Sequence, residues 1–155
     1  MINLLFETSL NSPLGELGLL ADDTHLIEIS FMGLKGLSLR GRQQKERFKV
    51  EIEELTQYFS KKRDSFTFKI QIGGTDFQKS VFNNMKTIKY GKVLTYKELA
   101  SKIGKPKAYR AVGNACGANR IPLVIPCHRV VSSSGLGGFG GGIKRKKFLL
   151  NLESN

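Results

Sequence analysis

The sequence predicts an α+β protein, with a small antiparallel sheet and one helix in its front half and a mostly helical back half. In residues 14–31 apolar and polar residues form two strand-like runs around a turn at residues 22–24, which predicts a β-hairpin. Beyond Gly73-Gly74 the apolar residues recur at helical spacing instead. We therefore expect an N-terminal α/β domain over residues 1–74 and a C-terminal domain over residues 75–155.

Two more elements are expected in the front half. Apolar residues at helical spacing in a charged stretch predict an amphipathic helix packed on the sheet. These residues are Phe48, Ile52, Leu55 and Phe59. Alternating apolar residues then predict a further strand. They are Phe66, Phe68, Ile70 and Ile72. His25 has no cysteine or second histidine near it in sequence, so we expect a solvated turn residue and no metal site.

The back half begins with three expected helices. Thr75 and Asp76 cap the first, whose apolar face consists of Phe77, Val81, Phe82, Met85 and Ile88. Thr95 and Glu98 form a capping box for the second, which ends at Gly104. Pro106 opens the third, which runs to Gly117. Two short helices joined by a tight turn with glycine are typical of a helix-turn-helix motif.

Small residues dominate the third of these helices, so it can come close to another surface. That surface is either a neighbouring helix or the groove of DNA. Arg110 is the one long side chain there that can enter a base stack. An enzyme that acts on a base in duplex DNA must extrude it, and the gap must then be filled.

Charge is distributed unevenly along the chain. Residues 1–76 hold 10 Lys and Arg against 11 Asp and Glu, whereas residues 77–155 hold 15 basic residues and only two acids, Glu98 and Glu153. A half almost without acids indicates a polyanion-binding face. Cationic density of this kind favours phosphate contacts whatever the base sequence.

Length and cysteine content indicate an intracellular protein. The 155 residues contain no apolar stretch near twenty residues, and Glu7 comes too early for a signal peptide. The two cysteines, Cys116 and Cys127, are too few for a disulfide scaffold. We expect free thiols and a cytoplasmic location.

The segment Ile125-Pro126-Cys127-His128-Arg129-Val130-Val131 places a thiol beside an imidazole in an apolar run. A nearby base or cation lowers the pKa of a thiol toward neutrality and so favours the reactive thiolate. The run suggests a strand that delivers the thiol to a pocket. Neighbours on a strand point to opposite faces, so a direct Cys127–His128 contact requires a turn or a bridging water. An inert, buried cysteine is the alternative.

Glycine fills residues 135–142 around Leu136 and Phe139. No Lys-Ser/Thr pair follows the cluster and no GxGxxG motif lies between a strand and a helix, so a nucleotide-cofactor loop is not expected. It is either a flexible linker or a set of backbone amides closing over a flat ligand, with Phe139 as one wall. The final helix is expected to turn Phe148, Leu149 and Leu152 inward and to leave the basic run 144–147 solvated.

With Tyr96, Arg110, Asn119 and the Pro-Cys-His-Arg-Val-Val string in this order, the chain resembles the O6-alkylguanine-DNA alkyltransferases, or methylated-DNA–protein-cysteine methyltransferases. The match is most specific over residues 75–153. In the front half it includes Ser12-Pro13-Leu14-Gly15 and the following hairpin. The resemblance implies an RNase H-like N-terminal domain and a winged helix-turn-helix C-terminal domain.

The resemblance also implies the chemistry. Cys127 would accept the alkyl group from O6 of a flipped-out guanine in one irreversible transfer, without metal or organic cofactor. His128 would generate the thiolate through a water, with Glu153 holding the imidazole. Asn119 would brace the turn that presents the thiol. O4-alkylthymine is left open as a second substrate.

Further site residues follow from the same resemblance. Those that would contact the guanine are Tyr96, Pro122, Val130, Phe139 and Gly140. Those that would contact the DNA are Tyr96, Lys97, Lys105, Arg110 and Ser133. Phe139 stands where many relatives have tyrosine, and Gly140 stands where some have serine. The metal-binding cysteines and histidines in the front domain of some relatives are absent, so no zinc is expected. The implied partner is double-stranded DNA with O6-alkylguanine. The protein would act as a monomer and associate with the nucleoid, and cooperative binding is left open.

Two other hypotheses fit parts of the sequence. A non-catalytic helix-turn-helix protein would bind DNA regardless of lesions and of Cys127. A cysteine hydrolase would turn over many substrate molecules instead of being consumed.

Overall fold

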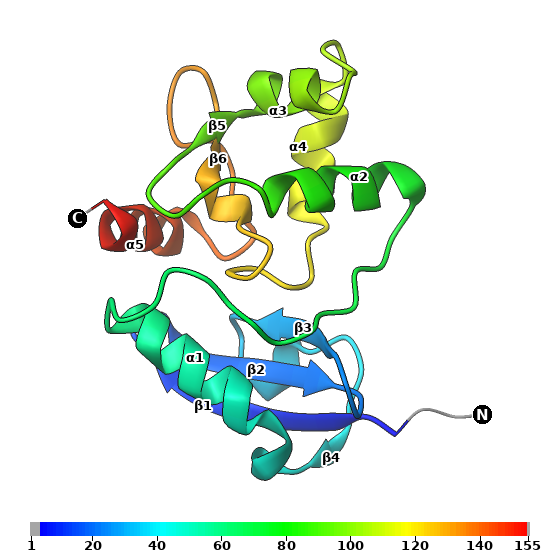
Figure 1. Cartoon of the computed structure of the whole chain (residues 1–155), viewed down its shortest axis with the longest axis vertical. Helices are drawn as coiled ribbons and strands as arrows, with labels where there is room; N and C mark the ends of the chain where they lie inside the picture. The colour runs from blue at the N-terminus through cyan, green and yellow to red at the C-terminus, as the bar shows by residue number, and fades with distance from the viewer. Residues whose placement is uncertain (1–3, 155) are drawn as a thin grey trace. The chain divides into compact units, whose positions relative to one another are not determined.

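The computed structural model describes residues 4–154, which form two compact units divided between Gln71 and Ile72 (Figure 1). The first unit is a four-stranded sheet with one helix, and the second is mostly helical, so the expected α+β class is confirmed. None of the helices within the described residues is both long and apolar enough to cross a membrane.

The sheet of the first unit has the strand order β3-β2-β1-β4. The strands are β1 (Phe6–Ser12), β2 (Gly15–Ala21), β3 (Leu26–Ser30) and β4 (Arg42–Gln43). The predicted hairpin is β2–β3, and β1 pairs antiparallel with β2 in unbroken register. The short β4 pairs parallel with β1, so the sheet is mixed and not purely antiparallel as expected. Leu17, Leu19 and Leu20 of β2 are fully buried, because the central strand is covered on both faces.

Helix α1 (Lys49–Phe59) confirms the predicted amphipathic helix, but its buried face differs from the predicted one. Leu55 and Tyr58 are buried together with Glu51 and Glu54, whereas Ile52 is only half-buried. The buried acids are satisfied by specific donors. Glu54, for example, accepts from the backbone N–H of Thr67 at 2.7 Å.

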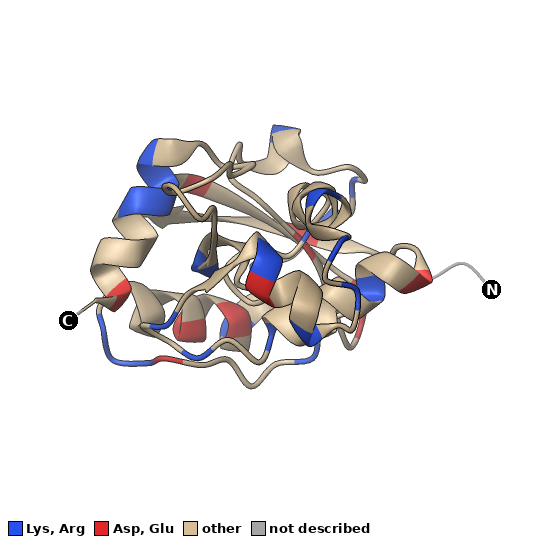
Figure 2. Ribbon diagram, turned by 90° about the horizontal axis from the view of Figure 1, so that it is seen from above, with Lys and Arg blue, Asp and Glu red and all other residues tan. Residues whose placement is uncertain are grey.

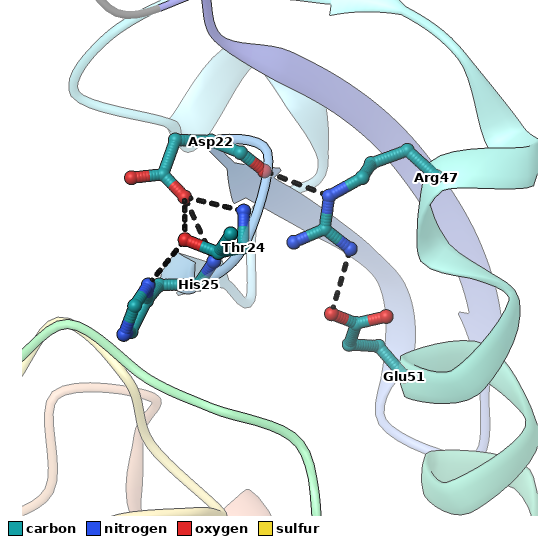
Figure 3. A network of polar contacts seen from close by, with 5 residues as sticks. All are labelled: Asp22, Thr24, His25, Arg47 and Glu51. Atoms are coloured by element: carbon teal, nitrogen blue, oxygen red, sulfur yellow. Dashed lines mark hydrogen bonds and ion pairs between the residues drawn. The ribbon is translucent and has the colours of Figure 1, made fainter.

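The turn between β2 and β3 is joined to the start of α1 by a polar network (Figure 3). Oδ1 of Asp22 accepts hydrogen bonds from the backbone N–H groups of Thr24 at 2.9 Å and His25 at 2.7 Å, which shapes the turn. Arg47 donates to the Asp22 carbonyl at 2.7 Å and to Glu51 at 3.0 Å. His25 is therefore a turn residue, half-buried, with Nδ1 2.6 Å from the Thr24 hydroxyl.

The strand predicted through residues 66–72 is wrong. Only one bridge forms there, in which Leu26 donates to the Lys69 carbonyl and accepts from the Gln71 N–H, both at 2.9 Å. The alternating rings instead pack on each other, with the centroid of Phe66 5.5 Å from those of both Tyr58 and Phe68. An alternating pattern reports which residues are buried, and here ring packing and not strand pairing produces it.

The second unit contains four helices among its described residues. They are α2 (Asp76–Met85), α3 (Tyr96–Lys102), α4 (Tyr109–Gly117) and α5 (Ile143–Glu153). Both predicted caps are present, because Thr75 and Thr95 each form a capping box, with Gln78 and Glu98. Strands β5 (Leu94–Thr95) and β6 (Val130–Val131) pair in parallel and join the start of α3 to the segment that carries Cys127.

Helix α3, the turn after it and α4 form the helix-turn-helix pair. Gly104 has φ +78, a conformation that glycine adopts without strain. The second helix begins at Tyr109 and not at Pro106, because residues 105–108 close a turn in which Ala108 donates to the Lys105 carbonyl at 2.9 Å. Figure 2 marks the basic and acidic residues along the ribbon.

Substituting Glu7 tests an ion pair of the sheet in which the carboxylate is buried and the arginine is exposed. Glu7 is 3% exposed and accepts hydrogen bonds from Arg40 Nε at 2.8 Å, Arg40 Nη2 at 2.7 Å and the Gly41 N–H at 2.8 Å. The Arg40 hydrogen bonds lower the pKa of Glu7 below 4.5, although burial opposes this. The stabilisation is therefore present above the unfolded-state pKa and is lost as the pH falls through the folded-state pKa.

We expect Glu7→Gln to reduce the unfolding free energy at neutral pH by about 1–2 kcal/mol, since Arg40 itself is exposed. The deficit should shrink in acid, as measured by urea unfolding across a pH series. Glu53→Gln, on the exposed face of α1, is the matched control and should change little. A Glu7→Gln deficit that stays constant into acid would contradict the assignment.

Candidate active site

A bent segment between α4 and β6 presents Cys127. The side chain of Asn119 spans it, since Nδ2 donates to the Ile125 carbonyl at 2.8 Å and Oδ1 accepts from the Ile121 N–H at 3.0 Å. Leu123 within this span is buried with φ +75, a strained conformation for leucine. The two Asn119 bonds span this strained bend. This supports the expectation that Asn119 braces the turn, a role that stays a prediction.

Cys127 opens a single 3₁₀ turn, η3 (Cys127–Arg129), and strand β6 begins only afterwards at Val130. The expectation of a strand through Cys127 is therefore wrong. A turn rotates successive side chains by much less than the half-turn of a strand. Cys127 and His128 need not point to opposite faces, which removes the geometric objection to their acting together.

His128 is completely buried and lies against the last residue of α5. Its Nε2 is 2.7 Å from Oε2 of Glu153, and Glu153 is 4% exposed. Arg129 holds the same carboxylate, with Nε 2.8 Å from Oε1 and Nη2 3.0 Å from Oε2. Two consecutive residues of η3 are thus attached to one carboxylate 24 and 25 positions later in the chain.

The protonation state of His128 follows from these contacts. Burial lowers the pKa of His128, the Glu153 carboxylate opposes this, and the charges of Arg129 and Lys146 act with burial. The ring is therefore neutral near pH 7. Because a carboxylate only accepts hydrogen bonds, Nε2 carries the proton and Nδ1 has a lone pair. Nδ1 is buried and bonds to no group of residues 4–154. It is thus positioned as a proton acceptor.

Opposing influences act on the Cys127 thiol. Burial raises its pKa, whereas a hydrogen bond from the Asn119 side chain and the positive charge of Lys146 lower it. Burial prevails at both thiols, so the pKa of Cys127 is raised on balance, and the pKa of Cys116 is raised to about 12, with the Cys127 charge acting in the same direction. Cys116 also contacts the sulfur of Met85 at 3.6 Å. Lys146 lowers the pKa of both thiols, but of the two only Cys127 also receives a side-chain hydrogen bond, from Asn119, that favours its thiolate.

Cys127 lies in a pocket of about 140 Å³. The pocket is lined by Tyr96, Gly113, Cys116, Gly117, Cys127, Gly138, Phe139 and Gly140. A cavity of about 150 Å³ accommodates a benzene ring, so the pocket matches a flat aromatic group in scale. Its walls are the start of α3, one face of α4 and the glycine-rich loop. Of the two readings of that loop, the structure thus favours a wall over a flat ligand.

The other residues implied by the resemblance lie outside the pocket lining. Pro122 is buried in the bent segment, and Val130 is buried in β6. Lys97, Lys105, Arg110 and Ser133 are all exposed, the first three on or between the helices of the helix-turn-helix pair. The lysines lie over rings, with Nζ of Lys97 5.3 Å from the Tyr109 centroid and Nζ of Lys105 5.4 Å from that of Phe77.

Some features of the site are absent from the sequence-based expectations. Lys146 is 0% exposed, so the expectation that the whole run 144–147 is solvated is wrong for this residue. The expectation that Phe148 points inward is also wrong, because it is 37% exposed. Helical spacing contained the signal, since Lys146, Leu149 and Glu153 lie three and four residues apart and share the buried face of α5. Similarly, Gly113, Cys116 and Gly117 share one face of α4.

This arrangement suits attack by a thiolate on an electrophilic carbon held in a flat pocket. It contains a nucleophile, a neutral imidazole and a carboxylate that orients the imidazole. No group of three or more His, Cys, Asp and Glu side chains within residues 4–154 is arranged to hold a metal ion.

Comparisons with known proteins place the chain in a family. Residues 5–72 match the domain described as "6-O-methylguanine DNA methyltransferase, ribonuclease-like domain", and residues 76–155 match the corresponding "DNA binding domain". The methylated-DNA–protein-cysteine methyltransferase of Methanosarcina barkeri is 43% identical over 150 residues, which cover 94% of this chain and 95% of that protein.

Solved structures agree with this assignment. Mycobacterium tuberculosis OGT in complex with DNA is similar, with a TM-score of 0.90 and 37% identity, covering 96% of this chain and 92% of that one. An O6-methylguanine DNA methyltransferase from Methanococcus jannaschii has a TM-score of 0.69 and 30% identity, covering 95% and 93%.

Removing Arg129 tests the buried carboxylate. We expect Arg129→Met to reduce the unfolding free energy by about 3 kcal/mol or more, because Glu153 would keep a buried charge without its cation. Arg110→Met, which removes an exposed arginine of α4, is the matched control and should change it by less than about 0.5 kcal/mol. Denaturant unfolding measures both, and similar values for the two variants would contradict this account.

Proposed function

Since the chain belongs to the 6-O-methylguanine DNA methyltransferase family, we propose that it repairs alkylated DNA by moving an alkyl group from O6 of guanine to Cys127. The observation that carries the proposal is the pocket of ring size with Cys127 in its wall. The name of the Methanosarcina barkeri relative and the DNA complex of the Mycobacterium tuberculosis relative support the same activity.

The transfer is a single displacement. The Cys127 thiolate attacks the alkyl carbon, an S–C bond forms, and the C–O6 bond breaks with its electron pair leaving on guanine. A hydrogen-bond donor then stabilises the guanine anion. The Tyr96 hydroxyl is a suitable donor, since Tyr96 borders the pocket. Its hydrogen bond to the Gly138 carbonyl is long, at 3.5 Å, so the proton can be given to guanine instead. The thioether is stable, so each molecule acts once.

His128 is the general base of the proposal, and it acts through a water. Its Nδ1 lone pair is buried without a partner among residues 4–154, and such an atom is costly unless a water satisfies it. A water between Nδ1 and the Cys127 sulfur would take the thiol proton to the imidazole. Glu153 then stabilises the imidazolium, because it already accepts from Nε2.

We assign the guanine to the pocket between Tyr96 and Phe139, with the Gly140 backbone along one edge. Val130 and Pro122 are buried and do not line the pocket. The Val130 carbonyl keeps a second lone pair beside its bond to Lys146, so it is able to accept from a guanine amine. Pro122, buried in the bent segment before Cys127, would contribute apolar packing.

Double-stranded DNA with O6-alkylguanine is the proposed partner, and the protein is proposed to act as a cytoplasmic monomer that joins the nucleoid on binding DNA. Lys97, Lys105 and Ser133 would contact phosphates, and Arg110 would replace the flipped base in the stack. Residues 75–155 would carry the alkyltransferase and DNA-binding domain, and residues 1–74 the ribonuclease-like one.

Intact-mass titration tests the proposed acceptor. Incubated with duplex DNA holding one O6-methylguanine, the protein should gain the mass of one methyl group and then react no further. Peptide mapping should place that group on Cys127. The matched variants differ in outcome: Cys127→Ser should gain nothing, whereas Cys116→Ser keeps the acceptor and should gain one group. DNA binding by a protein whose Cys127 remains unmodified would favour the non-catalytic helix-turn-helix hypothesis, and repeated turnover would favour a hydrolase.

Replacing Arg110 separates base flipping from chemistry. We expect Arg110→Ala to slow methyl transfer from duplex DNA by about 10- to 100-fold, since the extruded base costs a few kcal/mol of lost stacking and pairing. The same lesion in a single strand should lose much less, because no stack needs to be filled. Single-turnover rates measure both substrates, and equal losses would contradict the stacking role.

A further inference from the structure

Lys146 of α5 is a fully buried lysine that the proposed reaction has not used. Its relative exposure is 0%. Nζ donates to the Val130 carbonyl at 2.7 Å and to the Gly138 carbonyl at 2.9 Å, and it lies 5.9 Å from the centroid of the Tyr96 ring. It thereby connects β6, directly after the acceptor turn, with the glycine-rich loop that forms a pocket wall.

The charge of Lys146 has no ordinary counter-ion. Within residues 4–154 no ion pair joins it to a carboxylate. Burial lowers its pKa, and the groups that oppose this are the thiols of Cys127 and Cys116. Burying an ammonium is expensive unless hydrogen bonds or an opposite charge compensate. An anion formed at Cys127 would supply that opposite charge.

Other groups facing Cys127 do not supply a charge near neutral pH. His128 is neutral for the reasons given above. Burial raises the pKa of Cys116 from α4 and of Tyr96 from α3, so both stay protonated. Arg129 is paired with Glu153. Among these charged groups, Lys146 is therefore the one whose charge is not paired with a carboxylate of the described residues.

We propose that Lys146 is a positioning residue for Cys127, whose ammonium ties the pocket loop to the acceptor segment and provides the positive charge that the thiolate faces. The inference deepens the proposed function and rests on it for the reaction that the thiolate performs. Its electrostatic part concerns the thiol alone and is testable without DNA.

The test is the pH dependence of Cys127 carbamidomethylation by iodoacetamide, a reaction in which the thiolate displaces iodide. Lys146→Gln keeps amide donors but removes the charge, and the midpoint of its rate profile should move upward by about 1 pH unit. Lys146→Arg restores a cation and should return the midpoint most of the way. The matched control Lys147→Gln removes an exposed charge from the next position and should leave it unmoved. A folded Lys146→Gln with an unmoved midpoint overturns the proposal.

A measurement on the natural protein covers the case in which Lys146→Gln does not fold. By linkage, removing the negative charge at Cys127 must lower the pKa of Lys146 by as much as Lys146 favours the thiolate. NMR titration of the Lys146 side chain, before and after carbamidomethylation of Cys127, should show this fall. An unchanged Lys146 titration overturns the proposal.

DNA provides the readout for the transfer itself. With duplex DNA holding one O6-methylguanine, Lys146→Gln should lower the maximal single-turnover rate about 10-fold at neutral pH, in step with the smaller thiolate fraction, and the loss should shrink as the pH rises. The DNA concentration for half-maximal rate should stay the same. A loss confined to that concentration would overturn the positioning role. If the natural protein transferred no methyl group while the iodoacetamide midpoints moved as expected, the proposed function would fail and the Lys146–thiolate pairing would stand.

Discussion

The buried carboxylate of Glu153 bonds to two consecutive residues of the acceptor turn, His128 and Arg129. This contact attaches the end of α5 to η3. Arg129 also donates to the Ile88 carbonyl at 2.7 Å, and Tyr90 donates to the Leu152 carbonyl at 3.2 Å, so the segment after α2 joins the same cluster. The orientation of the imidazole depends on the whole cluster, because the ring is fixed only where the carboxylate is fixed.

Two buried cations, Arg129 and Lys146, lie near this centre and have different partners. Arg129 compensates the Glu153 carboxylate, and burial, supported by the charge of Arg129, keeps the imidazole neutral and able to take a proton. Lys146, seven residues before Glu153 on the same helix, instead donates to the Val130 and Gly138 carbonyls. Because both Lys146 and Glu153 are on α5, one helix sets the environment of the nucleophile and of its base together. A displacement of α5 would therefore disturb both.

Local chemistry explains which elements were predictable. Both capping boxes, the β2–β3 hairpin and α1 follow from residues close in sequence, and the structure contains them. The failures have one cause. Phe66 packs on Tyr58 of α1 and Phe68 packs on Phe66, and Lys146 faces inward because backbone carbonyls from β6 and the loop accept hydrogen bonds from it. Periodicity records burial, but it does not identify the partner that makes burial favourable.

The sequence by itself determined the charge division, the helix-turn-helix pair and the identity of the thiol beside an imidazole. Those properties depend on composition and short-range spacing. Tertiary structure alone decided that Cys127 lies on a turn and not on a strand, that Arg129 shares the Glu153 carboxylate with His128, and that Lys146 is buried with its ammonium on the Val130 and Gly138 carbonyls. Each of these depends on long-range packing, in which a charged side chain enters the interior only where donors, acceptors or an opposite charge compensate for its lost hydration.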